Sequence, residues 1–324
     1  MYLIDNYLDE EKLEQKPVRD GAGIGVMELG KDNKDIVVLT ADVSSSARAN
    51  FFEEKYKERF IQCGVAEQNM AGIAGGLAYN GMRPFFFAYS VFAVGRNWEP
   101  IRTTIAYPNN PVVICASHAG VSTGEDGATH QMTEDIAIMR AMPNMTVLSP
   151  ADYNEARKAV KAAYELKAPV YIRLIRCKTP IFTNPDKVFE IGKAQIINNG
   201  NDLTLITTGI TVYEALQAVE ELKKENSKLS IEIINLHTIK PIDKETIIAS
   251  AKKTGRIITV EDHQIQGGMG SAVSEVLSEL YPTHIKRLGL NNQFGATGDP
   301  NSLMAHFGID REAIKKTVLS ITNT

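Results

Sequence analysis

The sequence predicts an α/β protein of two domains, each built on a mostly parallel sheet with helices on both faces. Two observations carry this prediction. Short apolar runs alternate with longer amphipathic stretches, and one polar, proline-containing segment interrupts the alternation. With 324 residues, 44% of them hydrophobic, the chain can build two separate cores. We place the first domain at residues 1–178, a linker at 179–200 and the second domain at 201–324.

In the first domain we expect apolar runs to form strands and most of the stretches between them to form helices, as at Asp152–Leu166. Strands that are separated by helices can run parallel, so this order favours a parallel sheet that is covered on both faces. The expected strands are Asp35–Ala41, Phe60–Cys63, Arg83–Ala88, Val112–Ser117, Met145–Ser149 and Val170–Ile175.

The second domain repeats the alternation on a smaller scale. Its expected strands are Leu203–Thr208, Ile231–Asn235, Arg256–Glu261 and His284–Leu288. The expected helices between them are Val212–Glu225, Lys244–Ala251 and Gly268–Leu280.

The stretch Arg59–Ala78 combines a short strand, a turn at Gly64 and a helix rich in Gly and Ala, which another backbone can approach closely. Glu67 is the acid of the first turn of this helix, where free N–H groups and the helix dipole favour a carboxylate. Taken alone, this position fits an acid that tunes helix stability as well as one that takes part in catalysis.

A polar loop, His118–Gln131, follows a predicted buried strand. It therefore lies at the carboxyl end of a parallel strand, where open α/β sheets bind ligands. Its two histidines and two acids could donate, accept and transfer protons to a polyhydroxylated ligand. A metal site competes, although the two histidines are too far apart in sequence for a compact ligand pattern. A purely structural polar loop is a third interpretation. The four titratable residues are His118, Glu125, Asp126 and His130.

Two glycine patterns could suggest nucleotide binding. Gly21–Gly25 follows no predicted strand, so it lacks the context of a dinucleotide fingerprint. Gly267–Ser271 follows a strand and opens a helix, but Val273 replaces the third glycine. We therefore interpret the second pattern as a tight turn.

Charge and composition exclude several classes of partner. The formal net charge of −4 provides no basic surface for nucleic acid, and no apolar run approaches the roughly 20 residues of a membrane helix. Cys63, Cys115 and Cys177 stand singly, as in proteins of a reducing cytoplasm, and we expect no metal site.

Four motifs, in order, resemble the pyrimidine-binding domain of the transketolase family, and the second domain, including Gly267–Ser271, resembles that family's C-terminal domain, so that the two resemblances together cover nearly the whole chain. The motifs are Gly64–Asn69, Phe85–Phe92, Gly124–Gln131 and Pro143–Asp152. The resemblance implies a thiamine-diphosphate enzyme that transfers a two-carbon ketol unit.

In this family a carboxylic acid binds the pyrimidine ring of the cofactor, and the resemblance gives this role to Glu67. We expect the small residues of its helix to hold Glu67 in an apolar pocket that favours a protonated carboxyl. Tyr89 and Phe92 match the aromatic residues that stack on the pyrimidine. Asp42 resembles the family acid beside the cofactor and the partner chain. Gly95 departs from the pattern, because transketolases carry a further aromatic residue there.

The resemblance also implies the substrate site. His118 and His130 would serve catalysis and, with Asp126, contact the sugar hydroxyls and carbonyl. Arg19, Ser46 and Arg176 match the residues that bind the sugar phosphate, a role that suits the planar guanidinium group.

The family's diphosphate domain, with its Gly-Asp-Gly…Asn signature for Mg²⁺ or Ca²⁺, is absent from this sequence. The chain therefore resembles the C-terminal subunit of a split transketolase. A separate N-terminal subunit would bind the metal and the diphosphate, and this chain would also associate with itself in an α2β2 assembly. Its other partners would be phosphosugars.

Three alternatives remain open. Deoxyxylulose-phosphate synthase shares a similar loop but normally has Arg in place of His118. The β subunit of a 2-oxo-acid dehydrogenase has this length and domain order but usually lacks the Glu-Asp-Gly-x-Thr-His loop. A non-catalytic paralogue would keep the fold without turnover, although the intact Glu67 argues against it.

Overall fold

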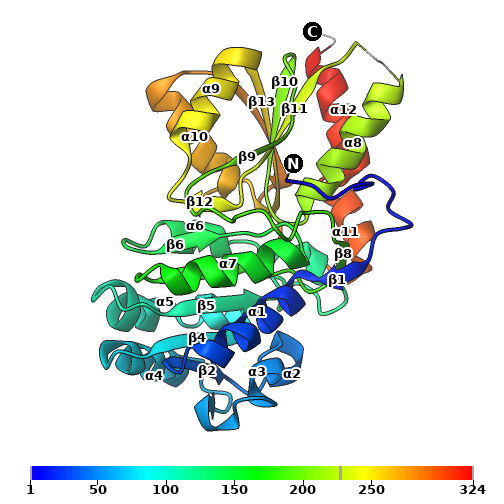
Figure 1. The fold of residues 1–324 in the computed structure, drawn as a ribbon. Coiled ribbons are helices and arrows are strands. Elements are labelled where there is room, and N and C mark those ends of the chain that lie inside the picture. Colours follow the sequence, from blue (N-terminus) through cyan, green and yellow to red (C-terminus); the bar gives the residue numbers. More distant parts are fainter. Residues whose placement is uncertain (1, 226–227, 323–324) are drawn as a thin grey trace.

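A seven-stranded sheet forms the lower domain in Figure 1. The structure is a computed structural model that describes residues 2–225 and 228–322. All neighbouring strands of this sheet are parallel except the edge pair β12–β6. From one edge to the other, the strands are β12 (Thr238–Lys240), β6 (Thr146–Leu148), β7 (Val170–Arg173), β5 (Val113–Ser117), β4 (Arg83–Tyr89), β2 (Ile36–Thr40) and β3 (Phe60–Gln62).

Helices cover both faces of this sheet because the buried strand residues are apolar on both sides. One face packs against α1 (Val18–Asp32), α2 (Ser44–Ala47), α3 (Asn50–Glu53) and α7 (Tyr153–Glu165). The other packs against α4 (Glu67–Tyr79), η3 (Ile101–Ala106) and α6 (Asp135–Arg140). The remaining helical turns are η1 (Lys57–Arg59), η2 (Val91–Gly95), α5 (Trp98–Pro100) and η4 (Val121–Thr123).

A five-stranded sheet forms the upper domain in Figure 1, and only its edge strand β9 is antiparallel. Its order is β14 (His284–Leu290), β13 (Arg256–Gln264), β10 (Leu203–Thr207), β11 (Ile231–Asn235) and β9 (Gln195–Asn198). One face carries α8 (Thr211–Glu225), α11 (Pro300–His306) and α12 (Arg311–Thr322), and the other carries α9 (Lys244–Thr254) and α10 (Met269–Leu280).

The two domains share a core. The buried cluster beneath α4 and α6 continues into residues of α9 and α10, for example Met269 and Val273. Strand β12, from the C-terminal half of the chain, completes the edge of the first sheet. A small antiparallel pair, β1 (Gln15–Pro17) with β8 (Lys178–Pro180), closes the N-terminal segment against the end of the first domain.

The predicted fold class is confirmed: both domains are α/β with mostly parallel sheets. The expected strands and helices appear with ends that differ from the expected ones by at most three residues. For example, Asp152 is the N-cap of α7, and its side chain accepts a hydrogen bond from the N–H of Glu155. The domain boundaries at 178 and 200 stay a prediction, and β9, within the expected linker, pairs with the second sheet.

The two glycine patterns have structural explanations. Gly21 and Gly23 lie in α1, where an added Cβ would stand 2.1 Å from the carbonyl oxygen of Tyr153 and 2.5 Å from that of Arg48. The first pattern therefore lets helices pack closely. Gly267 has φ +74° and begins the turn into α10, in agreement with the interpretation of the second pattern as a tight turn.

Candidate active site

The predicted site residues gather where the parallel strands of the first sheet end. Tyr89 ends β4, His118 follows β5, and Arg176 follows β7 shortly after the strand ends. Arg19 comes from the first turn of α1, and its N–H donates to the carbonyl of Ile175, so it joins the same edge. This is the edge at which open α/β sheets bind ligands.

The Tyr89 side chain connects two of the predicted substrate residues. Its hydroxyl donates a hydrogen bond to Ser46 Oγ at 2.9 Å. Its ring stacks on His118 with 3.6 Å between the ring centroids. Ser46, in the short helix α2, is therefore linked to His118 through Tyr89, although the two residues are far apart in sequence.

His118 is buried and neutral. Burial first, and then the charges of Arg19 and Arg176, lower the pKa of His118 to about 2. The guanidinium of Arg19 lies 3.2 Å from Nε2 of His118 and can only donate, so Nε2 accepts. The ring proton is therefore on Nδ1, which donates to Ser117 Oγ at 2.9 Å. In this arrangement His118 Nε2 is a hydrogen-bond acceptor.

Positive charge accumulates next to His118. Burial, together with the nearby guanidinium groups of Arg48 and Arg176, lowers the pKa of Arg19 to about 10. The Nε of Arg19 is buried and has no hydrogen-bond partner. Arg48 forms an ion pair with Asp20 at 2.7 Å. A buried donor without a hydrogen-bond partner, with Asp20 Oδ1 no closer than 4.0 Å, lies beside mutually repelling guanidinium groups and fits an anion.

Acidic side chains of the polar loop border this cluster. Arg176 Nη1 donates to Glu125 at 3.0 Å and to the carbonyl of Thr123 at 2.8 Å. Asp126 lies 3.8 Å from both Arg176 Nη2 and His118 Nε2. The Asp126 carboxylate is thus placed between the two predicted substrate contacts.

An aromatic wall extends from Tyr89 to Phe92 of η2. Their rings are roughly parallel, with centroids 6.0 Å apart. The ring of His130 meets Phe92 edge-on at 5.5 Å and Tyr89 at 6.1 Å. The second predicted catalytic histidine therefore lies against both predicted cofactor-binding rings.

Glu67 lies in the first turn of α4, as expected, and its side chain is only 5% exposed. The expectation of an apolar pocket is wrong, because Arg96 Nη1 donates to Glu67 Oε2 at 2.8 Å. The same guanidinium covers the ring of Phe92, with 4.9 Å between its central carbon and the ring centroid. The carboxylate is therefore paired rather than surrounded by apolar groups alone.

Two predicted positions stand apart from these contacts. Asp42 follows β2, has an exposed side chain and takes φ +59°, and its N–H donates to Gln62 at 2.7 Å. Gly95, at the position of a family aromatic residue, could accept a Cβ at an ordinary distance of 3.5 Å from Met132. Steric conflict therefore does not explain this glycine.

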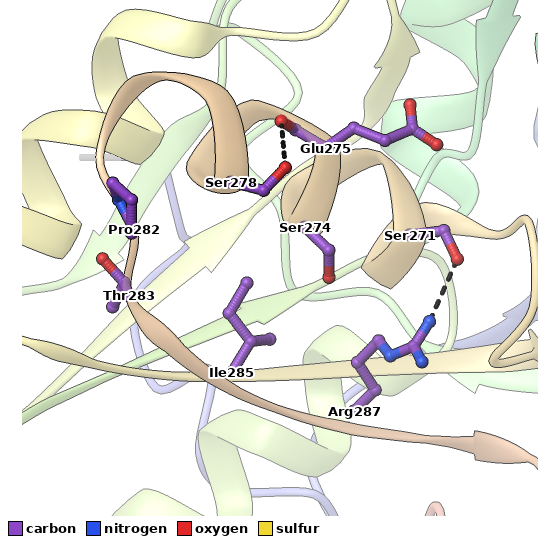
Figure 2. Close-up of a pocket in the computed structure, with 8 residues that line it drawn as sticks. All are labelled: Ser271, Ser274, Glu275, Ser278, Pro282, Thr283, Ile285 and Arg287. Carbon is purple, nitrogen blue, oxygen red and sulfur yellow. Dashed lines mark hydrogen bonds between the residues drawn. The ribbon is translucent and has the colours of Figure 1, made fainter.

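A groove of about 640 Å³ lies on the second domain between α10 and β14, and it contains none of the predicted site residues (Figure 2). Arg287 donates to the carbonyl of Ile265 and to Ser271 Oγ. Ser274 and Ser278 donate to backbone carbonyls of their own helix. The polar groups of this groove are thus satisfied internally.

The described part of the chain also bears on metal sites, reactive cysteines and membrane-spanning helices. It contains no group of three or more His, Cys, Asp or Glu residues that could hold a metal ion. Cys63, Cys115 and Cys177 are free, and burial raises the pKa of each thiol. Over residues 2–225 and 228–322, no helix is long and apolar enough to cross a bilayer.

The fold and this edge define an α/β protein in which the carboxyl ends of the strands carry a cationic cluster beside an aromatic wall. The model of the transketolase pyrimidine-binding domain matches residues 14–180, and that of the transketolase C-terminal domain matches residues 192–314. The chain belongs to the transketolase family.

Three relatives match over almost their whole length. A transketolase C-terminal section of Methanocaldococcus jannaschii is 46% identical and is matched over 94% of this chain and 96% of its own. One of the subunits of the apulose-4-phosphate transketolase of Phocaeicola vulgatus is 38% identical over 91% and 94% of the two chains. The 6-deoxy-6-sulfo-D-fructose transketolase subunit SqwH of a Clostridium species is 36% identical over 97% of each.

A solved structure gives the same result for the fold. A split-gene transketolase, described as an inactive β4 tetramer, superposes with a TM-score of 0.87 at 39% identity. The match covers 96% of this chain and 99% of that one. The chain thus corresponds to the C-terminal section of transketolases.

Several residues of the site were missed by sequence reasoning. Arg48 joins the cationic cluster from the end of α2, and the pairing of the loop acid Glu125 with Arg176 was not foreseen. Arg96, which directly follows Gly95, pairs with Glu67. The sequence holds no local pattern that marks such partners, because they come from separate elements.

Proposed function

We propose that this chain is the C-terminal subunit of a split transketolase. It would transfer a two-carbon ketol unit from a ketose phosphate to an aldose phosphate, using thiamine diphosphate held between this chain and a separate subunit. As an enzyme of carbohydrate metabolism, with the pentose phosphate pathway as one setting, it would act in the cytoplasm.

One observation carries the proposal. A continuous series of side-chain contacts joins Glu67, through Arg96, Phe92 and His130, to Tyr89. From Tyr89 it continues to His118, and from there to the cationic cluster of Arg19, Arg48 and Arg176. An acid and an aromatic wall at one end, with an anion site at the other, suit a cofactor ring beside a sugar phosphate.

The residues present fit the pyrimidine end of the cofactor. The guanidinium of Arg96 is a planar, hydrogen-bonding group that both covers Phe92 and donates to Glu67. A pyrimidine ring needs the same two contacts, stacking and a hydrogen bond to the carboxyl group. Glu67, Tyr89 and Phe92 would hold the ring, with Asp42 at its border. Bound thiamine diphosphate would supply the electron sink for the ketol unit.

The side chains of this chain would then position the sugar and move its protons. Glu67 would form a hydrogen bond with the pyrimidine nitrogen in place of the one it accepts from Arg96. His130, against both aromatic rings, would orient the reacting carbonyl. His118 Nε2, which accepts from Arg19 in this structure, would receive a hydroxyl hydrogen of the sugar once Arg19 donates to the phosphate instead.

At the far end, Arg19 and Arg176, with Ser46, would bind the phosphate, and Asp126 would accept from a neighbouring hydroxyl. The unpartnered, buried Nε of Arg19 supports this assignment. The partner subunit would contribute the diphosphate site and its Mg²⁺ or Ca²⁺, and self-association of this chain would give an α2β2 assembly. The related subunits named for apulose 4-phosphate and for a sulfonated fructose show that the sugar varies among these relatives.

The test is reconstitution. The chain is combined with the product of a gene that encodes a diphosphate-binding transketolase domain, and ketol transfer is assayed over phosphorylated and sulfonated ketose donors with several aldose acceptors. We expect transfer only when both chains, the cofactor and Mg²⁺ are present. The matched variant Glu67→Gln should keep partner binding and melting temperature but lose at least about a hundredfold in kcat. Formation of a stable complex without transfer to any acceptor would contradict the proposal.

A further inference from the structure

The polar loop His118–Gln131 leaves the first sheet, but the second domain supplies the support for its first half. The Asp262 carboxylate, near the end of β13, accepts hydrogen bonds from the N–H of Val121 at 2.8 Å and from the N–H of Ser122 at 3.2 Å. It also accepts from Ser122 Oγ at 2.6 Å. All of these groups are buried, so Asp262 satisfies donors that are shielded from water.

The approach between loop and carboxylate is close. Gly120 has φ +79°, and a Cβ added there would stand 2.1 Å from Asp262 Oδ2. Only glycine allows this conformation and this distance together. The loop backbone next to His118 therefore lies directly on the carboxylate.

Asp262 is itself held in place by the first sheet. Arg173 Nη2 donates to the carbonyl of Asp262 at 2.6 Å, while its Nε donates to Asp135 at 2.9 Å. The Arg173 side chain is 2% exposed and the Asp135 side chain is fully buried. A buried ion pair thus fixes the backbone of the residue that holds the loop.

The other end of the loop is also tied to the second domain. Gln131 Nε2 donates to the carbonyl of Ala296 at 2.7 Å and to that of Gly124 at 2.9 Å. Gln131 directly follows His130. Each predicted catalytic histidine therefore lies within a few residues of an anchor from the second domain.

These contacts matter because His118 does not adopt a relaxed backbone. Its φ is +61°, a left-handed conformation that non-glycine residues adopt when their surroundings impose it. The flanking segment Ala119–Ser122 is fixed by the β-bridge between Ala119 and Met132 and by Asp262. If Asp262 released the loop, the ring of His118 would lose its fixed position against Tyr89 and Arg19.

We infer that Asp262 is a positioning residue, through which the second domain sets the geometry of the loop that carries His118 and His130. The second domain thereby takes part in substrate binding without touching the sugar. The kinetic part of this inference rests on the proposed function, since it assumes that the loop binds the substrate.

Glu261 provides a matched control. It precedes Asp262 on β13, so its side chain points to the opposite face of the sheet. It is also a buried carboxylate that accepts two backbone N–H bonds, from Met269 at 2.6 Å and from Gly270 at 2.8 Å. Those bonds hold the start of α10 and leave the loop untouched.

The first experiment is hydrogen exchange on the isolated chain, which needs neither cofactor nor partner. We expect Asp262→Asn to raise exchange at residues 119–124 at least tenfold, because an amide nitrogen cannot accept from Ser122, while α10 keeps its protection. Glu261→Gln should raise exchange at the start of α10 and leave exchange at residues 119–124 unchanged. Unchanged loop protection in a folded Asp262→Asn chain, or equal loop exchange in both variants, would overturn the inference.

The second experiment uses the reconstituted complex. Asp262→Asn should lower kcat/KM for the sugar at least tenfold, whereas Glu261→Gln should leave it within twofold even at an equal loss of melting temperature. Should Asp262→Asn not fold, Ser122→Ala removes one hydrogen bond of the three, and a severalfold rise in loop exchange decides the question. If the wild-type complex shows no transfer, the proposed function fails while the exchange result still judges Asp262.

Discussion

Arg96 Nη1 lies 2.8 Å from Oε2 of Glu67, and the guanidinium also covers Phe92. The Arg96 side chain is 48% exposed, whereas that of Glu67 is 5% exposed. The cation thus reaches from solvent to a buried acid. If Glu67 and Phe92 bind the pyrimidine, the cofactor ring and the Arg96 guanidinium compete for the same two side chains.

We therefore predict that Arg96→Ala tightens cofactor binding by the reconstituted complex. A charge-assisted bond contributes about 1.5–3 kcal/mol, and solvent screening of the half-exposed Arg96 brings the expected gain to about threefold to tenfold in Kd. Calorimetric titration with thiamine diphosphate measures it, and Arg102→Ala, at an exposed arginine of η3, is the control. Unchanged or weaker binding by Arg96→Ala would show that the two groups do not compete.

A second prediction concerns the phosphate end. Arg176→Ala should raise KM for phosphorylated sugars about fivefold to thirtyfold, because one charge-assisted contact is lost from a partly exposed site. KM for the matching unphosphorylated sugar should change little. Initial-rate kinetics with both sugars measure the difference.

A substitution of Glu125 should change KM in the opposite direction to Arg176→Ala. Its carboxylate occupies Arg176 Nη1 at 3.0 Å, and Glu125→Gln removes that competing charge. We expect KM for the phosphorylated sugar to fall twofold to threefold. If Arg176→Ala affects both sugars equally, Arg176 does not bind the phosphate.

Much of this site could be predicted from the sequence. The apolar runs of β2, β4, β5 and β7 are fully or almost fully buried, so hydrophobic pattern and strand order already placed His118 at the carboxyl ends of the strands. The family resemblance then added Arg176, Ser46 and Arg19, which have no local signal of their own.

The parts that could not be predicted depend on contacts between distant segments. Strand β12 has three residues, and its pairing with β6 joins positions that are far apart in the chain. Asp262 looks like any acid at the end of a strand until the fold brings it against Ser122. Arg96 lies in the turn after η2, and the local sequence pattern there does not indicate a contact with Glu67. Such long-range pairing is set by tertiary packing and not by local periodicity.

The depressed pKa of His118 predicts a pH dependence of stability. In the folded chain its pKa is lowered to about 2 by burial and by Arg19, whereas the unfolded chain binds the proton near pH 6.5. The unfolded state therefore binds more protons between these values. The free energy of unfolding should fall as pH drops below about 6.5, by up to about 1.4 kcal/mol per pH unit for this group.

Urea unfolding between pH 5 and 7.5 tests this. Asn tolerates the positive φ of residue 118. His118→Asn should therefore reduce the dependence of the unfolding free energy on pH by the equivalent of about one proton taken up on unfolding. His237, whose pKa burial and Lys158 lower to about 3, is the matched control, since His237→Asn should reduce the slope equally. Only the His118 variant should also lower kcat/KM. A slope that is unchanged in His118→Asn would refute the neutral buried state of that ring.

The last prediction is that this chain alone binds thiamine diphosphate weakly, with a Kd above about 1 mM, and gains micromolar affinity when the partner subunit is added. Its own candidate contacts, Glu67, Tyr89 and Phe92, would reach only the pyrimidine end of the cofactor. The diphosphate end binds with a divalent cation, and such hard cations need a cage of oxygen ligands. Among the described residues no acidic or histidine cluster offers one. On α4, moreover, Gly72 and Gly76 face open space and Tyr79 is 79% exposed, so this helix presents a surface that another chain could cover. Calorimetry with Mg²⁺ and cofactor, before and after adding the partner, measures both affinities. Micromolar binding by the isolated chain would show that the second subunit is not needed to complete the site.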